Sequence, residues 1–389
     1  MNLPVYLDYH ATTPCDPRVV EAMAPCFRDT FGNPSSRSHP FGRAAEDAVE
    51  NARRRVAGAI GAEPKEIVFT ASATEANNLA LRGAAHARRE AGDGDHLVAT
   101  AIEHKSVLGP LKALAEEGFE ITFVEVDERG RVDPGAVADA ITPRTTVVSA
   151  MVANNEIGTI EPVAEIAAVA REAGAWVHTD AVQALGRVPV DVDDLDVDLL
   201  SLSAHKFYGP KGVGSLYVRK RPRRVELEPL VVGGGQERGL RSGTHNVPGI
   251  VGMAAAAKIA VDERETEAER VEALRDRLQA TLVSEIEGLE VNGDPESRLP
   301  HNLSVTIPHV DGEALLLSLH DVAVSSGSAC RSSAPGGSHV MKAIGRSDEE
   351  ARSTIRFGLG RWSDEKEIDY AARRVVETVG QLRSMSVLP

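Results

Sequence analysis

The sequence predicts an α/β fold divided into two domains, and three observations lead to this prediction. Short apolar runs alternate with helical patterns from about residue 45 to residue 260. Strands that alternate with crossover helices form mainly parallel sheets that are covered on both faces. After about residue 260 the pattern changes to a long charged helix followed by shorter strands. The chain of 389 residues is also too long for one simple core and suits two domains.

The first part of the chain contains the strands and helices expected of a parallel sheet. The candidate strands cover residues 66–70, 96–101, 121–126, 145–151, 176–179 and 197–202. Helical patterns cover residues 74–89, 106–117 and 162–173. Ligands of such sheets bind beyond the carboxyl ends of the strands, so we expect the functional site there.

A smaller α+β domain is expected after residue 260. Residues 261–286 predict a long amphipathic helix, residues 302–307 predict a strand, and two more helices follow. The first 15 residues or so are extended and are expected to pack with this second part. We therefore predict a large domain over residues 16–260 and a small domain formed by residues 1–15 and 261–389.

Charge and hydropathy favour a cytoplasmic protein that binds neither nucleic acid nor membranes. The formal net charge is −15, and such a surface repels nucleic acid and anionic lipid. No apolar run reaches the roughly 18 residues that a transmembrane helix needs. Residues 1–5 lack the basic start and the apolar run of a signal peptide.

The three cysteines differ in their surroundings. None belongs to a CxxC pair, so we expect neither a resident metal nor a disulfide framework. Cys15 and Cys26 each follow a proline and are interpreted as small packed residues. Cys330 lies in a segment rich in serine and glycine, which cannot fill a core. We expect this cysteine in an exposed loop, where Arg331 helps to stabilise the reactive thiolate.

Polar and charged residues follow two of the predicted strands and are typical of a pyridoxal phosphate (PLP) site when they occur together, as the next residues show. Lys206 follows the strand at 197–202, next to Ser203 and His205, so its amine can form a Schiff base while its neighbours hold a phosphate. Asp180 ends the strand at 176–179, where a carboxylate can keep the pyridine nitrogen of PLP protonated. Taken singly, Lys206 can be a solvated charge and Asp180 a helix N-cap. Their combination in one region is far more specific.

The segment at residues 70–78 is a third candidate, because it joins a predicted strand to a predicted helix with small and hydroxyl side chains. Free N–H groups at a helix N-terminus, together with the helix dipole, can hold a phosphate. An ordinary Ser/Thr cap is the alternative, and this segment alone does not distinguish the two.

Short motifs are spread along the whole chain. They are Tyr-Leu-Asp-Tyr-His-Ala-Thr-Thr-Pro at 6–14, Phe-Gly-Asn-Pro-Ser-Ser at 31–36, Glu-His at 103–104, Asn-Asn-Glu-Ile-Gly at 154–158, Asp-Ala-Val-Gln at 180–183, Ser-Ala-His-Lys at 203–206, Arg-Ser-Gly-Thr at 241–244, Ser-Ser-Gly-Ser-Ala-Cys at 325–330 and Arg-Phe-Gly-Leu-Gly at 356–360. Together they resemble the class V PLP enzymes of the cysteine desulfurase family, of the NifS and IscS type. The resemblance implies fold type I of the PLP-dependent transferases, with a mainly parallel seven-stranded sheet in the large domain and a smaller α+β domain. Ser72 departs from the pattern, since many relatives have glycine there.

The resemblance also implies roles around the PLP ring. Lys206 would hold PLP through its amine and later move the α-proton of the substrate. Asp180 would pair with the pyridine nitrogen, and Gln183 would hydrogen-bond the phenolic oxygen. His104 would lie over the ring face and assist proton transfers. In the alternative interpretation, His104 only caps a turn.

Other positions are implied to bind the phosphate and the substrate. The phosphate would rest on four residues of one subunit, which are Ala73, Thr74, Ser203 and His205. Thr244 would reach the phosphate of the neighbouring subunit, which implies a homodimer. Asn155 would contact the cofactor or the substrate, Arg356 would bind the substrate carboxylate in a two-pronged manner, and Asn33 would help with that carboxylate. In the alternative interpretation, Asn155 is simply a residue that favours a turn, and Arg356 is a residue in a surface ion pair.

The implied reaction takes sulfur from L-cysteine, leaves a persulfide on Cys330 and releases L-alanine. The sulfur would pass to an acceptor protein or to an iron–sulfur scaffold, with Cys330 as a transient cluster ligand. A selenocysteine lyase or a class V aminotransferase is the alternative on the same fold, and Cys330 argues against the aminotransferase. A non-catalytic scaffold subunit is the alternative from another class, and the presence of Lys206, Asp180 and His104 argues against it.

Overall fold

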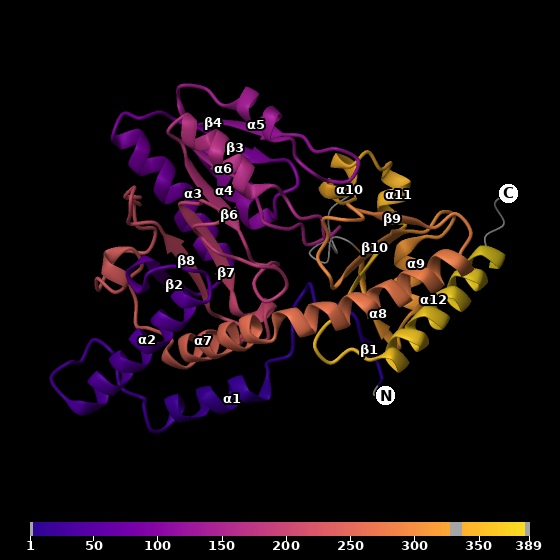
Figure 1. Ribbon diagram of the computed structural model, residues 1–389, viewed down its shortest axis with the longest axis horizontal. Helices are drawn as coiled ribbons and strands as arrows, with labels where there is room; N and C mark the ends of the chain where they lie inside the picture. The colour runs from indigo at the N-terminus through magenta and orange to yellow at the C-terminus, as the bar shows by residue number, and fades with distance from the viewer. Residues whose placement is uncertain (1–2, 327–336, 386–389) are drawn as a thin grey trace.

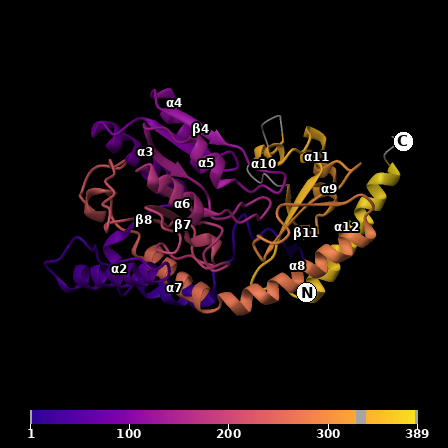
Figure 2. The ribbon, with the colours of Figure 1, turned by 45° about the horizontal axis from the view of Figure 1, so that its top comes forward.

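The computed structural model describes residues 3–326 and 337–385, so Cys330 and Arg331 lie outside the described residues. The chain forms a larger and a smaller body side by side, and both termini lie in the smaller one (Figure 1). Helices α7 (Val247–Asp262) and α8 (Arg264–Glu285) run end to end along one side and connect the two bodies (Figures 1 and 2).

A seven-stranded sheet forms the centre of the larger body, in the order β2-β8-β7-β6-β5-β3-β4. Its strands are β2 (Ile67–Thr70), β3 (His96–Thr100), β4 (Glu120–Val124), β5 (Thr145–Ser149), β6 (Trp176–Asp180), β7 (Leu199–Ser203) and β8 (Gly214–Val218). The pairs from β4 to β7 are parallel, whereas β8 runs antiparallel to both β7 and β2. This mixed α/β architecture with a mostly parallel sheet confirms the predicted fold class.

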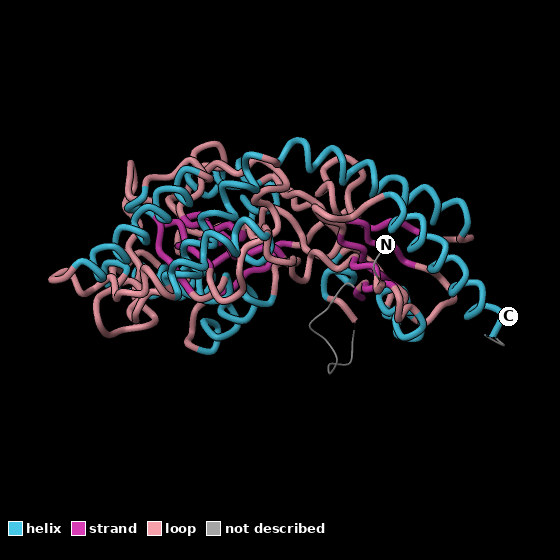
Figure 3. The backbone as a smooth tube through the Cα atoms, turned by 90° about the horizontal axis from the view of Figure 1, so that it is seen from below, coloured by secondary structure: helices cyan, strands magenta, loops and turns pink. Residues whose placement is uncertain are grey.

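Helices cover both faces of this sheet, and each face has its own apolar core (Figure 3). The helices and short 3₁₀ turns before α7 are α1 (Pro17–Met23), η1 (Ala24–Phe27), α2 (Pro40–Gly58), η2 (Pro64–Glu66), α3 (Ala73–Glu90), α4 (Lys105–Glu116), α5 (Pro134–Ala140), α6 (Val163–Glu172), η3 (Ala204–Lys206) and η4 (Glu237–Gly239). Buried residues of α3 and α4 pack on one face, and those of α2, α6 and α7 pack on the other. Alternating strand residues such as Val147 and Val148 point to opposite cores, as the period of a strand requires.

The smaller body contains a four-stranded antiparallel sheet and a two-stranded parallel one. Their orders are β12-β13-β10-β9 and β1-β11. The strands are β1 (Val5–Tyr6), β9 (Glu290–Asn292), β10 (Asn302–Thr306), β11 (Val322–Ala323), β12 (Ser325–Ser326) and β13 (Thr354–Gly358). The helices that follow α8 in the described residues are α9 (Gly312–Ser318), α10 (His339–Ala343), α11 (Asp348–Arg352) and α12 (Glu365–Met385). Val5 and Leu7 belong to the same core as residues from α8 onward. The boundary of the two domains at residues 260 and 261 stays a prediction.

The structure adds elements that the sequence pattern did not predict. Strand β8 follows β7 through a tight turn without a crossover helix, so the expected strand–helix alternation does not reveal it. Four helices follow α8 in the described part of the chain, where two were expected, because α10 and α11 have only five residues each. No helix within residues 3–326 and 337–385 is long and apolar enough to cross a membrane.

Candidate active site

The candidate site lies at the carboxyl ends of β6 and β7, which are neighbouring parallel strands. Asp180 is the last residue of β6 and Ser203 the last residue of β7. The chain then makes one short turn, η3 (Ala204–Lys206), which brings His205 and Lys206 to the same edge of the sheet. Because parallel strands end at a common edge, the predicted lysine and aspartate share one site.

The Asp180 carboxylate is almost completely buried and is held at both oxygens. Its Oδ1 accepts the N–H of Val182 at 3.0 Å, within a turn: no helix begins in the described residues between β6 and β7, so Asp180 is not a helix N-cap. Its Oδ2 accepts a hydrogen bond from Asn77 Nδ2 at 2.8 Å. The carboxylate therefore has a fixed orientation at the end of β6.

Asn77 connects Asp180 to His104. The same Nδ2 atom donates to Ser106 Oγ at 2.8 Å, and Ser106 Oγ lies 2.8 Å from His104 Nδ1. His104 is the N-cap of α4, and its Nδ1 accepts the N–H of Ser106 at 3.1 Å. Because Nδ1 accepts, the neutral ring carries its proton on Nε2. Burial lowers the pKa of His104, although Asp180 opposes this, so the neutral form is favoured.

A second buried histidine completes the surroundings of Asn77. His178 Nε2 lies 3.2 Å from Asn77 Oδ1, and its Nδ1 lies 2.8 Å from Ser149 Oγ. Burial lowers the pKa of His178 to about 4, so this histidine stays neutral. The sequence analysis missed Asn77, Ser106 and His178. The available signal was that Asn77 shares the buried face of α3 with apolar residues such as Ala80 and Ala84.

The N-terminal segment covers the Lys206 side of the site. Lys206 Nζ donates to the carbonyl oxygens of His10 and Ala11, the latter at 3.0 Å. Gln183 Nε2 donates to the same His10 oxygen at 3.2 Å. His205 Nδ1 lies 3.1 Å from Thr12 Oγ1, and burial together with nearby lysines lowers its pKa to about 4.

The N-terminus of α3 lies at the same edge and offers backbone donors for a phosphate. The side chain of its N-cap, Ser72, accepts the N–H of Glu75 at 3.2 Å, which leaves the N–H groups of Ala73 and Thr74 at the helix end. Ser72 has extended backbone angles, with φ of −169°, so this position does not require glycine. Close approach occurs at Gly214 instead, where a Cβ would come within 2.9 Å of Ala73 N.

Arg356 lies in β13 of the smaller body and is only 2% exposed. Its Nη1 donates to the carbonyl oxygen of Asn155 at 2.7 Å, and its Nη2 donates to Asp8 Oδ1 at 3.0 Å. Each of these two nitrogens carries a second hydrogen, which neither bond uses. Asn155 therefore meets Arg356 through its backbone, and Asp8 is a partner that the sequence analysis did not identify.

Asn33 and Thr244 lie on the surface of the single chain. Asn33 lies in the exposed loop between η1 and α2, where its Oδ1 accepts the N–H of Ser35 at 2.9 Å. This loop is far from the small sheet that carries Arg356 (Figure 1). Thr244 is also exposed. Pro34, next to Asn33, and His245, next to Thr244, line one hollow of about 430 Å³.

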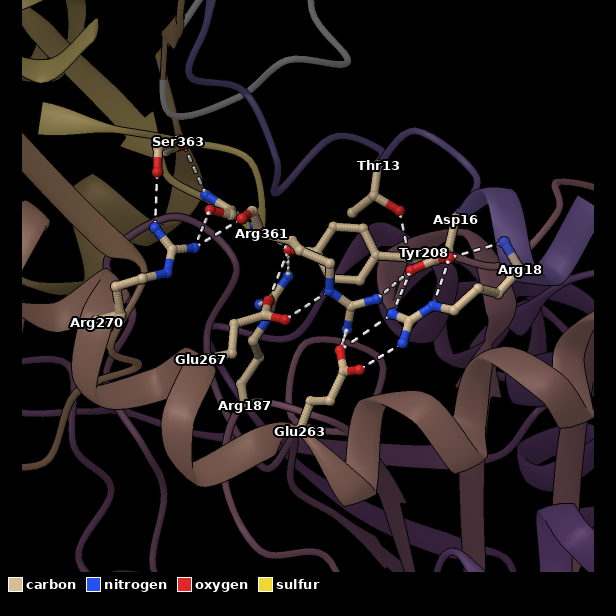
Figure 4. Close-up of polar contacts among 11 residues, drawn as sticks. Thr13, Asp16, Arg18, Arg187, Tyr208, Glu263, Glu267, Arg270, Arg361 and Ser363 are labelled. Carbon is tan, nitrogen blue, oxygen red and sulfur yellow. Dashed lines mark hydrogen bonds and ion pairs between the residues drawn. The ribbon is translucent and has the colours of Figure 1, made fainter. Parts of the chain in front are cut away.

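A buried polar cluster around Tyr208 holds the turn that follows Lys206 (Figure 4). The hydroxyl of Tyr208 donates a hydrogen bond to Glu267 Oε1 at 2.8 Å. The same oxygen accepts two hydrogen bonds, from Arg187 Nη2 at 2.8 Å and from the backbone N–H of Arg361 at 2.6 Å. The guanidinium groups of Arg187 and Arg361 lie 4.9 and 4.2 Å from the ring centre of Tyr208. Arg361 also pairs with Glu267 at 2.7 Å and with Asp16 at 2.6 Å. The cluster thus ties both bodies and the N-terminal segment to the lysine turn.

The donor set at this site fits PLP. A fixed carboxylate suits a protonated pyridine nitrogen, and an amide such as Gln183 suits a phenolic oxygen. A lysine amine lies on the same edge, and a helix N-terminus with backbone donors suits a phosphate.

Comparisons with known proteins agree with this arrangement. The family model for class-V aminotransferases matches residues 5–371. Cysteine desulfurase IscS of Anaeromyxobacter dehalogenans (strain 2CP-C) is 55% identical over all of this chain and 95% of the relative. Cysteine desulfurase IscS of Pseudomonas aeruginosa (strain UCBPP-PA14) is 52% identical over all of this chain and 96% of the relative.

Solved structures show the same similarity. A NifS-like protein, 40% identical, superposes with a TM-score of 0.90 and covers 97% of this chain and 100% of its own. DndA from Streptomyces lividans, 41% identical, has a TM-score of 0.78 over 91% of this chain and 99% of its own. A structure described as SspA in complex with cysteine, 38% identical, has a TM-score of 0.80 over 92% of this chain and 99% of its own.

The fold and the residues at its strand ends define a PLP-type enzyme of the class-V aminotransferase family. Within that family, the chain belongs to the cysteine desulfurases of the NifS and IscS type, which confirms the resemblance seen in the sequence.

Proposed function

We propose that this protein is a cysteine desulfurase that takes sulfur from L-cysteine, holds it as a persulfide on Cys330 and releases L-alanine. The observation that carries the proposal is the convergence of Lys206, Asp180 and Gln183 at the ends of β6 and β7. Relatives named cysteine desulfurase IscS, between 50% and 55% identical over the whole chain, support it. So does the solved neighbour described in complex with cysteine.

PLP, when bound, supplies an electron sink that stabilises negative charge on the substrate's α-carbon. Lys206 holds the cofactor through its amine and takes the α-proton of the substrate. Asp180 keeps the ring nitrogen protonated, and Gln183 donates to the phenolic oxygen. His104 assists proton transfer, because its neutral ring carries a proton on Nε2.

The phosphate and the substrate carboxylate have separate binding residues. The N–H groups of Ala73 and Thr74 bind the phosphate together with the side chains of Ser203 and His205. Arg356 binds the substrate carboxylate with the Nη1 and Nη2 hydrogens that are not bonded to the Asn155 carbonyl or to Asp8. Asn155 contributes to the same binding site from its turn.

Cys330 carries out the sulfur transfer. Its thiolate forms an S–S bond to the substrate sulfur while the substrate's Cβ–S bond breaks. The electron pair of the broken bond stays on the three-carbon fragment, which takes up one proton at Cβ, regains one at Cα and leaves as L-alanine. The persulfide then passes to an acceptor, and we propose a sulfur-acceptor protein or an iron–sulfur scaffold of the cytoplasm as that partner.

We also propose that the working unit is a homodimer. Asn33 and Thr244 are both exposed on the single chain, and their neighbours Pro34 and His245 line one hollow, so both side chains are available to a partner subunit. Thr244 then binds the partner's phosphate and Asn33 supports the partner's substrate carboxylate. Sedimentation that finds a fully active monomer excludes this arrangement.

The proposed function is tested by locating the cofactor and counting products. Borohydride reduction of the wild type followed by peptide mapping should find PLP on Lys206. With an excess of a thiol that reduces the persulfide, the enzyme should release one alanine for each sulfide from L-cysteine. The Lys206→Ala variant should retain no covalently attached PLP and show no turnover above background. Attachment at Lys211, or turnover by Lys206→Ala at the wild-type rate, overturns the proposal.

A further inference from the structure

His10 is a buried histidine that lies between Gln183 and the smaller body, and the proposed reaction assigns it no role. It is 1% exposed and makes a side-chain hydrogen bond on each side of its ring. Its Nδ1 lies 3.1 Å from Gln183 Oε1, and its Nε2 lies 3.0 Å from Asn302 Nδ2. Gly358 lies against the Cδ2 edge of the ring, where a Cβ added at residue 358 would come within 2.7 Å of Cδ2.

The Asn302 side fixes which nitrogen of His10 accepts. Asn302 Nδ2 also donates to the carbonyl oxygen of Glu156 at 3.3 Å. A carbonyl oxygen only accepts, so the nitrogen end of the Asn302 amide must face it. The second hydrogen on Nδ2 points at His10 Nε2, which therefore accepts and carries no proton.

The Gln183 side leads independently to the same assignment. Gln183 Nε2 donates to the backbone oxygen of His10 at 3.2 Å, so the nitrogen end of this amide faces a carbonyl as well. Gln183 Oε1 is then the atom that meets His10 Nδ1, and it requires a donor there. A proton on Nδ1 and none on Nε2 gives each of the two contacts one donor and one acceptor.

We propose that His10 is a positioning residue, which uses a single neutral tautomer to keep the Gln183 amide turned so that its second N–H, the one not bonded to the His10 carbonyl, is available to the phenolic oxygen of PLP. This role rests on the proposed function, because the phenolic oxygen needs a donor and the oxygen end of Gln183 would repel it. Burial lowers the pKa of His10 far below its usual value, and nearby Arg356 and Lys206 lower it further, so the ring stays neutral. The backbone oxygen of His10 also accepts from Lys206, which places this residue against both partners of the cofactor.

The tautomer is tested directly by ¹⁵N NMR of the full-length protein labelled at histidine, with and without PLP. The His10 signals are assigned by their loss in the His10→Leu variant. We expect a protonated Nδ1 and an unprotonated Nε2 that do not titrate between pH 6 and pH 9, as a buried neutral ring requires. A proton on Nε2, or titration near the usual value for histidine, overturns the proposal.

The positioning role is tested by PLP binding in a double-mutant cycle of His10→Leu and Gln183→Ala. We expect His10→Leu to raise the PLP dissociation constant about tenfold and His10→Asn, whose amide can donate in the place of Nδ1, to stay within about threefold of wild type. In the Gln183→Ala background, His10→Leu should add almost nothing, because it acts through Gln183. Fully additive losses overturn the proposal. Absence of PLP binding by the wild type overturns the proposed function instead, whereas the NMR result still reports on the tautomer.

Discussion

At the scale of single residues, the site depends on buried amides whose nitrogen and oxygen ends cannot be exchanged. Asn77 donates to Asp180 and Ser106 with Nδ2 and meets His178 with Oδ1. Gln183 and Asn302 are each oriented by a backbone carbonyl and share His10 between them. Such groups set the direction of the reactive side chains without touching the substrate, so their loss should weaken the cofactor's hold as well as the fold.

The Asn77→Ala variant should show this double effect. It removes the donor to Asp180 Oδ2 and leaves the buried Ser106 hydroxyl with one partner fewer, which costs about 1–3 kcal/mol of unfolding free energy. It should also weaken PLP binding, because the Asp180 carboxylate loses its fixed orientation. Urea unfolding and PLP titration measure the two effects, with Asn51→Ala on the exposed side of α2 as the matched control. Identical stability and PLP affinity in the two variants would refute the role of Asn77.

At the scale of elements, connections between strands are held by buried carboxyl groups. Glu161 precedes α6, and its Oε2 accepts the N–H of Val132 at 2.9 Å, which joins the chain after β5 to the chain after β4. Its Oε1 is buried without a hydrogen-bond partner among the described residues. Burial raises the pKa of Glu161 to about 8, so at neutral pH the folded protein holds a proton there.

This raised pKa predicts how stability depends on pH. The unfolded chain releases the proton near pH 4.5, whereas the folded chain holds it up to about pH 8. Unfolding therefore releases a proton between these values, and stability falls as pH rises through this window, by at most about 1.4 kcal/mol per pH unit for this group. In Glu161→Gln the amide oxygen still accepts from Val132, so unfolding curves between pH 5 and pH 8 should have a shallower dependence. The exposed Glu165→Gln should behave like the wild type, and a wild-type slope in Glu161→Gln would count against this account.

The sequence predicted those parts of the fold and site that local patterns encode. The strand ends at Asp180 and Lys206 follow apolar runs closed by turn residues, so both positions were found from the sequence. Asn77, His10 and Asn302 were missed because their partners lie 103, 173 and 292 residues away along the chain. No local pattern distinguishes such a residue from an ordinary polar one. Strand β8 was missed because an antiparallel neighbour needs no crossover helix.

At the scale of the whole molecule, the larger and smaller bodies meet through charged groups as well as apolar ones. Arg187 from the larger body and Arg361 from the smaller one both pair with Glu267 on α8, around the hydroxyl of Tyr208 (Figure 4). Arg187, Glu267 and Tyr208 are all buried. The buried charges of Arg187 and Glu267 would therefore destabilise the fold without their partners. Burial alone would raise the pKa of Glu267, but the two arginines outweigh it and keep the carboxylate ionised.

Removal of Glu267 should therefore cost more than removal of an acidic neighbour at the surface. Glu267→Ala leaves Arg187 buried without its carboxylate and should lower the unfolding free energy by about 3–5 kcal/mol. Glu263→Ala removes a carboxylate that is 40% exposed and pairs with Arg18 and, at 3.5 Å, with Arg361, so it should cost less than about 1 kcal/mol. Hydrogen exchange should also become faster around residues 13–18 and 360–363 in Glu267→Ala. Equal costs for the two variants would contradict the cluster's role in joining the bodies.

The most direct test of the central claim is the fate of sulfur in the three single cysteine variants. In Cys330→Ser the protein should keep PLP but produce almost no alanine from L-cysteine, because a serine hydroxyl is not ionised at neutral pH and cannot hold sulfane sulfur. Cys15→Ser and Cys26→Ser should turn over like the wild type, since burial raises the pKa of both thiols and leaves them unreactive. Alanine is measured for each variant, and mass spectrometry locates the added sulfur. The account predicts one sulfur on Cys330 alone; normal turnover by Cys330→Ser, or sulfur on Cys15 or Cys26, would contradict it.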